Sequence, residues 1–201
     1  MIAARLHHEL IAPLQELRTR LADNVCIQSE INDVTAQTAK LAIAAYHFPE
    51  TVRGSAKAMF SPAAEDLRQR LGDVADTAKH GQLRNQSRQA TLYAGLAFEA
   101  DPNLGFRFLR TEVWAHNDRF GEFDLVNSIA TFCEFLASEY EVIVDAHHEP
   151  PAHPFRPEAV AYVTKRTFVA ANIRLFFYGK DGTGALVRSD PPEVRFAVFE
   201  R

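Results

Sequence analysis

Apolar residues in the first part of the chain recur at helical spacing. Leucines three and four positions apart predict a helix over residues 2–22, in which Pro13 either causes a kink or starts a new helix. Residues 24–48 carry a second helical pattern, with apolar side chains on one narrow seam, and Pro49 is expected to end it. The seam is typical of a bundle helix; a coiled coil that forms a homodimer is the alternative.

Residues 62–80 predict a further helix, and local signals mark both of its ends. Ser61 can cap the first turn, and Pro62 suits the first helical position, where a missing N–H costs little. Gly81 suits a left-handed cap at the other end. A last helix is predicted over residues 121–142, where apolar residues again share one side.

Between these two helices the pattern changes from helical to alternating. Residues 88–99 and 106–117 alternate apolar and polar positions around the turn Asp101-Pro102-Asn103-Leu104-Gly105, which predicts a β-hairpin. A proline-rich stretch at residues 147–154 is typical of a linker. Short alternating runs between residues 169 and 199, with a glycine-rich turn inside them, predict a small C-terminal β region.

This order of elements favours an α+β fold over alternating β-α-β units. We expect residues 1–146 to form an antiparallel bundle of about four helices, with the β-hairpin (about residues 88–118) inserted before the last helix. Residues 147–201 are expected to form a linker and a C-terminal β appendage packed on the same domain.

Composition narrows the class of protein. The chain has 201 residues, of which 47% are hydrophobic and 24% charged, as in ordinary globular domains. Its net charge of −4 argues against a strongly electrostatic nucleic-acid binder. Cys26 and Cys133 lie in helical patterns and are interpreted as buried free thiols. No apolar run reaches the ~20 residues that span a membrane, and we expect a cytoplasmic protein without membrane contact.

The end of the helix at residues 62–80 concentrates polar side chains. Asp73, Asp76, Lys79 and His80 are three or four positions apart, so all can share one helix face. Asp76 can orient His80 or raise its basicity, as carboxylates do in acid–base sites. The alternative is an ordinary ion-paired helix end, in which the two basic groups satisfy terminal carbonyls.

The run Asp76-Thr77-Ala78-Lys79-His80 closes this helix, and a hairpin and another helix follow it. In these respects residues 24–142 resemble uncharacterised bacterial proteins with HEPN-like helical bundles, in which an alanine-rich helix ends in Lys-His. The HEPN superfamily includes metal-independent ribonucleases of toxin and defence systems, together with catalytically silent members that serve binding or assembly. The resemblance implies one of these two roles, in a defence or mobile-element context.

The HEPN nuclease signature is an arginine followed four to six residues later by a histidine. Arg110 and His116 fit that spacing and are the candidate catalytic pair. Thr111 departs from the signature, which usually has Asn, His or Asp after the arginine, and the run alternates like a strand where the family has a helix. Six residues span ~20 Å in a strand but only ~9 Å in a helix, so the alternation argues against a nuclease.

The hairpin offers a second kind of site. Arg110, Trp114 and His116 fall on one face of the predicted strand, where they can form a polar and aromatic patch for a ligand or an RNA base. Arg84 lies close in sequence to Lys79 and His80 and can add positive charge. The candidate ligand-binding residues are therefore Asp76, Lys79, His80, Arg84 and Trp114. The alternative is that Trp114 packs on a helix and the charges face solvent.

Metal and phosphate motifs are weak. His147, His148 and His153 lie in the proline-rich stretch, and histidine binds zinc or nickel, but adjacent histidines in a loop lack fixed geometry. The glycine-rich run at residues 179–184 lacks the order of a P-loop and is typical of a hairpin turn. We expect neither a metal nor a cofactor.

Taken together, the sequence predicts an interaction or ligand-binding module, with RNA or a nucleotide bound through a local basic patch as a candidate partner. A metal-independent ribonuclease that uses Arg110 and His116 is the alternative, and a histidine-dependent metal protein is the third hypothesis. A pocket between the helix end at His80 and the hairpin would support the binding module, whereas convergence of Arg110 and His116 would support the nuclease.

Overall fold

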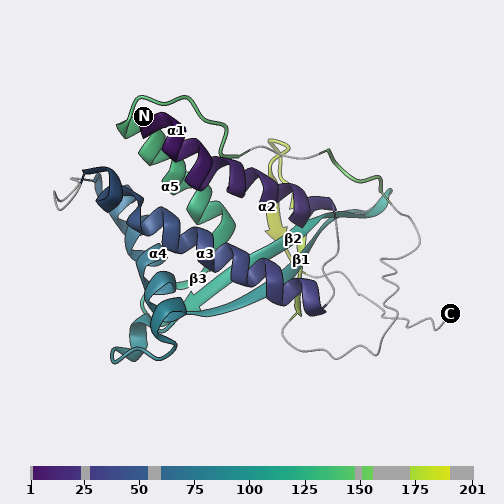
Figure 1. Cartoon of the computed structure of the whole chain (residues 1–201). Helices are drawn as coiled ribbons and strands as arrows, with labels where there is room; N and C mark the ends of the chain where they lie inside the picture. Colours follow the sequence, from purple (N-terminus) through teal and green to yellow (C-terminus); the bar gives the residue numbers. More distant parts are fainter. Residues whose placement is uncertain (1, 24–27, 54–59, 148–150, 156–172, 191–201) are drawn as a thin grey trace.

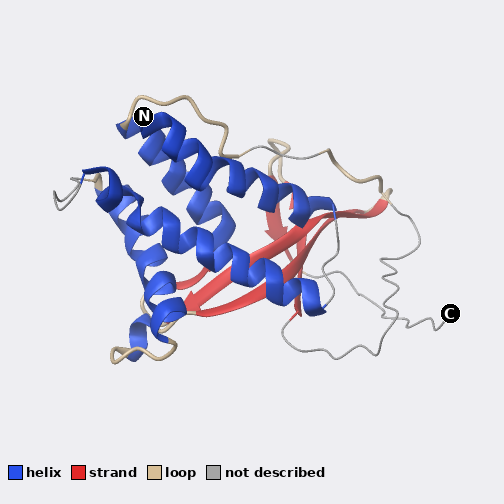
Figure 2. Ribbon diagram, in the orientation of Figure 1, coloured by secondary structure: helices blue, strands red, loops and turns tan. Residues whose placement is uncertain are grey.

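The computed structural model describes residues 2–23, 28–53, 60–147, 151–155 and 173–190. The predictions for Cys26, His148 and the strand-like run at residues 194–199 lie outside these ranges. Within them, helices pack against one face of a five-stranded sheet (Figures 1 and 2). The α+β class is therefore confirmed.

The first helix passes through Pro13 without a break in direction. It consists of α1 (Ile2–Leu6), a π-helical turn (His7–Ile11) and α2 (Ala12–Asp23). In the π-turn the N–H of Ala12 bonds to the carbonyl of His7, five residues back. Proline lacks an N–H and its ring crowds the preceding turn, so a turn that is already widened by one residue accommodates it. At Pro13 the sequence predicted either a kink or the start of a new helix, and the structure shows a π-helical turn just before the proline instead.

The next two helices match their predicted bounds to different degrees, and the predicted start of the first, at residues 24–27, lies outside the described ranges. α3 (Gln28–Arg53) continues past Pro49, which the sequence predicted as its end. Its last turn is held by Arg5, which donates to the carbonyl oxygen and to the Oγ1 atom of Thr51. α4 (Pro62–His80) has the predicted bounds. Ser61 caps it by accepting a hydrogen bond from the N–H of Ala64, and Gly81 ends it at a positive φ of 69°.

The predicted hairpin is present, and it is the centre of a larger sheet. β1 (Thr91–Asp101) pairs antiparallel with β2 (Gly105–Asn117), and β3 (Gly121–Asp124) pairs with the end of β2. β4 (Ile173–Lys180) pairs with β1 in parallel, and β5 (Leu186–Ser189) completes the order β3-β2-β1-β4-β5.

The expectation of a helical bundle with an inserted β-hairpin and a small C-terminal β region is therefore wrong. β4 lies directly beside β1, so the C-terminal strands extend the hairpin into one mixed sheet. Alternation along a strand reports which face each side chain takes, but it carries no information on the strand that pairs with it. The extent of the sheet could not be read from the local pattern for that reason.

α5 (Leu125–Glu139) is shorter than the predicted helix over residues 121–142. Residues 121–124 instead form β3, and Asp124 caps the helix by accepting a hydrogen bond from the N–H of Asn127. The apolar side of α5 is fully buried at Ile129, Cys133 and Leu136. The strand and the helix thus meet directly at Asp124.

The two faces of the sheet have different chemistry. On the helix face, Ala94, Val113, Ala115 and Phe123 belong to the main hydrophobic core. Alternate residues point the other way and form what we call the concave face. Its central members are Tyr93, Glu112, Trp114, Phe176 and Tyr178.

Side chains close the concave face by reaching across it. Arg174 of β4 and Arg188 of β5 both bond to Glu122 of β3, at 2.6 and 3.4 Å. β3 and β4 are separated by two strands, about 14 Å at the usual spacing, so direct contact requires the sheet to curl toward this face. Gly95 permits the curl, because a Cβ atom there would lie 2.0 Å from the ring of Phe176. The curl brings β5 near β2 and shapes the site described next.

Candidate functional site

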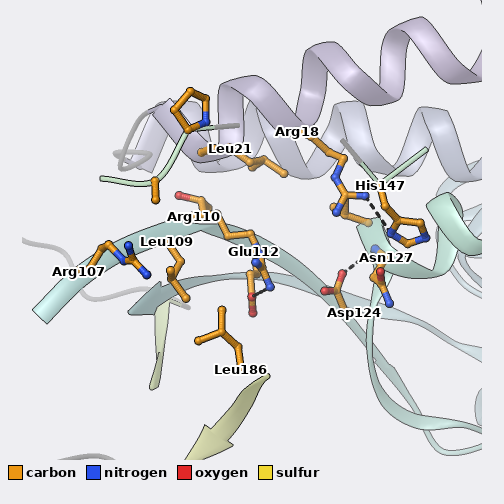
Figure 3. A pocket seen from close by; sticks show the side chains of 15 residues that line it. Arg18, Leu21, Arg107, Leu109, Arg110, Glu112, Asp124, Asn127, His147 and Leu186 are labelled. Carbon is orange, nitrogen blue, oxygen red and sulfur yellow. Dashed lines mark hydrogen bonds and ion pairs between the residues drawn. The ribbon is translucent and has the colours of Figure 1, made fainter. Parts of the chain in front are cut away.

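A cavity of about 370 Å³ lies beside β2, between α2, the start of α5 and β5 (Figure 3). β3 covers only the Trp114–Asn117 part of β2, so the preceding residues of β2 face other elements. The polar lining comes from α2, β2, the junction of β3 with α5, and the loop after α5: Arg18, Arg107, Arg110, Glu112, Asp124 and His147. Leu21, Leu109, Val126 and Leu186 contribute apolar walls.

Arg18 is held at one end of the cavity. Its Nη1 atom donates to the carbonyl oxygen of Ala146 at 2.9 Å and lies 3.5 Å from Nδ1 of His147. Because a guanidinium group only donates, this contact fits a His147 ring whose Nδ1 atom accepts. The Nε2 atom of His147 lies 3.3 Å from the Glu134 carboxylate. The three side chains therefore fix one another, and the Arg18 cation stays at the cavity.

Arg110 is positioned by a buried carboxylate. Its guanidinium forms an ion pair with Glu112 at 2.8 Å. Glu112 is only 2% exposed and also accepts hydrogen bonds from Nε1 of Trp114 (2.9 Å) and the hydroxyl of Tyr178 (3.1 and 3.2 Å). Burial raises the pKa of Glu112, and Asp124 adds to this, while Arg110, Trp114 and Tyr178 partly offset it. Glu112 is thus saturated by protein donors.

Asp124 stands where β3 ends and α5 begins. Its Oδ1 atom accepts a hydrogen bond from the N–H of Asn127 at 2.9 Å. Burial raises the pKa of the Asp124 carboxyl, and the backbone N–H of Asn127 and the cations of Arg110 and Arg18 oppose that shift. Figure 3 shows the carboxylate on the side of the cavity opposite Arg18.

Arg107 supplies a third cation. It is hydrogen-bonded to the buried carboxylate of Glu99, and its guanidinium lies 4.7 Å from the centre of the Phe155 ring. Its Nε atom is buried without a hydrogen-bond partner in the part of the chain that the structure describes. A donor left in this state is satisfied when an acceptor reaches it.

Of the candidate catalytic pair, only Arg110 lines the cavity. His116 is exposed and lies six positions further along β2, where it pairs with Thr91 and Glu122. The confirmed strand geometry separates positions 110 and 116 by roughly 20 Å. The structure therefore does not bring the two side chains together.

The candidate ligand-binding residues divide into two places. Trp114 lies on the concave face and joins the cavity through its hydrogen bond to Glu112. Asp76 accepts a hydrogen bond from Arg88 at 2.6 Å, and Lys79 contacts His47. His80 and Arg84 are exposed.

The helix end and the aromatic ribbon therefore do not enclose a common pocket. α4 packs on the helix side of the sheet, where Val113 and Ala115 point, and Trp114 points to the opposite side. The Asp73, Asp76 and Arg88 ion pairs instead tie α4 to the chain just before β1. The acids of this helix end are thus ion-paired, but their partner is Arg88, whereas the alternative in the sequence analysis assigned Lys79 and His80 to the terminal carbonyls.

Sequence reasoning missed Arg18, Glu112 and Asp124, and it considered His147 only as a candidate metal ligand. For Glu112 a signal was present, because alternation places it on the same face as Arg110 and Trp114. The others come from segments that approach β2 only in the folded chain. Nothing in the local pattern indicated that meeting.

Other reactive groups have structural partners. His153 bonds to the carbonyl oxygen of Ala22 at 2.6 Å, and burial raises the pKa of the Cys133 thiol to about 12. Within the described ranges no group of three or more His, Cys, Asp or Glu side chains could hold a metal ion. In the same ranges, no helix has both the length and the apolar character needed to cross a bilayer.

Comparisons with protein-family models, with curated proteins and with solved structures gave no match for this chain. The resemblance to HEPN proteins therefore stays a prediction, and function has to be argued from the cavity itself.

Proposed function

We propose that this protein is a ligand-binding module that holds a small anionic molecule in the cavity beside β2. The observation that carries the proposal is the convergence of Arg18, Arg107 and Arg110 on one hollow of about 370 Å³. Sites for small molecules usually have volumes of about 300–1,000 Å³. Arginine is the side chain whose planar fork suits carboxylate and phosphate groups best.

The balance of charge supports an anion. Of the two lining carboxylates, Glu112 is buried, is ion-paired with Arg110 and accepts from Trp114 and Tyr178, so it is balanced within the protein. The first turn of α5 faces the cavity at Asp124, Val126 and Asn127, and the N-terminal end of a helix attracts negative charge. The lining therefore has three arginines against two carboxylates, although the whole chain carries a net charge of −4.

The apolar walls favour an organic ligand over a bare ion. Leu21, Leu109 and Leu186 line the space beside the arginines. A phosphate or carboxylate on the arginines, joined to an apolar or aromatic body on the leucines, satisfies both kinds of surface. A nucleotide has this character, in line with the expected RNA or nucleotide partner.

Fluorescence of Trp114 provides a direct test. It is the only tryptophan of the chain, and it is hydrogen-bonded to Glu112, which lines the cavity. Inorganic phosphate and adenosine monophosphate are titrated into the wild type, Arg18→Gln and Arg84→Gln. Arg84 is an exposed arginine outside the cavity, so its variant is the charge-matched control.

We expect saturable binding of the nucleotide to the wild type and to Arg84→Gln. Arg18→Gln should bind at least about tenfold more weakly, since a hydrogen bond to a charged group contributes roughly 1.5–3 kcal/mol. Equal binding by wild type and Arg18→Gln would overturn the proposal. Loss of binding in Arg84→Gln alone would move the site to the end of α4.

A further inference from the structure

The geometry points to a more specific ligand class: a molecule that carries a cationic amino group in addition to its anionic group, with Asp124 selecting the amino group. This inference rests on the proposed function, because Arg18 and Arg110 must hold the anionic end. The inference concerns Asp124, because a purely anionic ligand would leave this carboxylate of the cavity without a partner of opposite charge.

The two lining carboxylates are not equivalent. Glu112 accepts from Arg110, Trp114 and Tyr178 and is 2% exposed, so it has no capacity left for a ligand. Asp124 is half-buried, and its carboxylate accepts backbone hydrogen bonds from the first turn of α5, from the N–H of Asn127 to Oδ1 at 2.9 Å and from Val126. A carboxylate has about four acceptor positions, so Asp124 keeps a capacity for a ligand that Glu112 lacks.

The surroundings of Asp124 explain why an amino group fits there. The charged or titratable groups that share the cavity with it are Arg18 of α2, Arg107, Arg110 and Glu112 of β2, and His147 of the loop after α5. An anion that binds the two arginines screens them from Asp124 and places a like charge next to it. A ligand ammonium group removes that repulsion and gives the half-buried carboxylate a partner of opposite charge.

The groups that bind the anionic end and the cationic end of the ligand lie at different positions in the cavity. Figure 3 shows Arg18 and Asp124 on opposite sides of the same end of the hollow, with Asn127 beside Asp124. Asp124 is fixed by its role as the cap of α5, and Arg18 is fixed by Ala146 and His147. Both groups are thus preorganised to bind one ligand that spans them.

A matched pair of probes tests the inference. Ethyl phosphate and phosphoethanolamine share the phosphate and the two-carbon chain, and only the second carries an ammonium group. Both are titrated by calorimetry into the wild type, Asp124→Asn and Asp124→Ser. Asparagine and serine cap helices about as well as aspartate, so both variants keep the start of α5 while removing the charge.

We expect phosphoethanolamine to bind the wild type about tenfold more tightly than ethyl phosphate, and both variants to bind the two probes within about twofold of each other. In the wild type the ratio should fall as the pH is lowered through the pKa of Asp124, because a protonated carboxyl no longer pairs with an ammonium group. The ammonium group lowers the second phosphate pKa of phosphoethanolamine below that of ethyl phosphate, so the ratio for the wild type is compared at each pH with the ratio for Asp124→Asn, which carries the same phosphate effect.

The possible failures are distinguishable. Equal binding of both probes to the wild type, or a preference that persists in Asp124→Asn and Asp124→Ser, overturns this inference and leaves the proposed function standing. Loss of both probes in folded variants also overturns it, because Asp124 would then shape the site without selecting the amino group. Failure of both probes to bind a wild type that binds adenosine monophosphate overturns the inference alone, and failure of the nucleotide as well removes the proposed function.

Discussion

Glu112 binds three side chains, two from its own strand and one that is distant in the sequence. Its neighbours Arg110 and Trp114 follow from alternation along β2, and that part of the arrangement was predictable. Tyr178, which donates to both carboxylate oxygens, lies 66 residues later and reaches Glu112 only because β4 joins the sheet. The residue pattern therefore identifies the members of the cluster that lie on β2, whereas the contribution of Tyr178 depends on strand pairing.

The burial of Glu112 predicts a pH-dependent stability. Because its pKa is raised in the folded state, the folded protein binds more protons than the unfolded chain between the unfolded and folded pKa values. The contribution of Glu112 is most favourable below the unfolded pKa and is lost as the pH rises through the folded pKa. Urea unfolding of Glu112→Gln at several pH values should show a smaller decline across this window than the wild type.

Glu16 supplies the control for that experiment. It is an exposed glutamate of α2, so Glu16→Gln should leave the pH profile of the unfolding free energy parallel to that of the wild type. If Glu112→Gln also ran parallel to the wild type, the buried carboxyl would not be titrating as inferred.

Gly95 carries a second prediction at this scale. An alanine Cβ atom would lie 2.0 Å from Cε2 and 2.6 Å from Cδ2 of the Phe176 ring, so the ring must move. Gly95→Ala should lower the free energy of unfolding by about 1–3 kcal/mol, as measured by urea denaturation. Gly182→Ala, with open space around its Cβ position, should change it by less than about 0.5 kcal/mol.

The double variant Gly95→Ala/Phe176→Ala distinguishes a clash from a general loss of strand stability. If the clash is the cause, removing the ring relieves it, and the two changes together cost less than the sum of the single changes. Additive costs would contradict this explanation.

At the scale of elements, helices with local end signals were the most predictable. α4 has the predicted bounds because Ser61, Pro62 and Gly81 act within a turn of its ends. α3 passes Pro49 because its final turn is secured by Arg5, a contact between helices that local rules do not contain. α5 begins later than predicted because residues 121–124 pair with β2 and form the strand β3.

The attachment of α4 to the sheet depends on Asp73. Its carboxylate is fully buried, accepts from Arg88 at 2.6 Å and from Asn117 at 3.1 Å, and lies 3.7 Å from Arg119. Asp73→Ala leaves these donors without their acceptor and should cost about 2–3 kcal/mol of unfolding free energy.

Asp76 is the matched control, because it binds the same Arg88 from a site that is 31% exposed. Asp76→Ala should cost at most about 1 kcal/mol in the same thermal or urea unfolding measurement. Equal costs for the two variants would show that burial of Asp73 is not what makes the network stabilising.

At the scale of the whole molecule, the described residues form two hydrophobic clusters of unequal size. The larger joins the helices to Ala94, Val113 and Ala115 of the sheet. The smaller contains Leu96, Phe98 and Phe177 with neighbouring strand residues, and no helix residue belongs to it. The α+β class followed from the order of the elements, but this division did not, because it depends on where the helices stop covering the sheet.

Hydrogen exchange should reveal the two clusters. Amides near the tip of the β1–β2 hairpin, around Phe98 and Phe106, should be at least about tenfold less protected than those around Val113 and Ala115, which lie under the helices. Mass spectrometry of deuterated peptides measures both regions in one experiment. Uniform protection along β2 would show that the sheet unfolds as one unit.

The parallel pairing of β1 with β4 also bears on how the chain is made. β1 and β2 leave the ribosome well before Ile173, so one edge of β1 has no partner strand until β4 has been synthesised. An open edge that carries Leu92, Leu96 and Phe98 is a template for another growing or truncated chain. A premature stop between Asp101 and Ile173 would therefore yield products prone to self-association, even though they retain most of the helical residues.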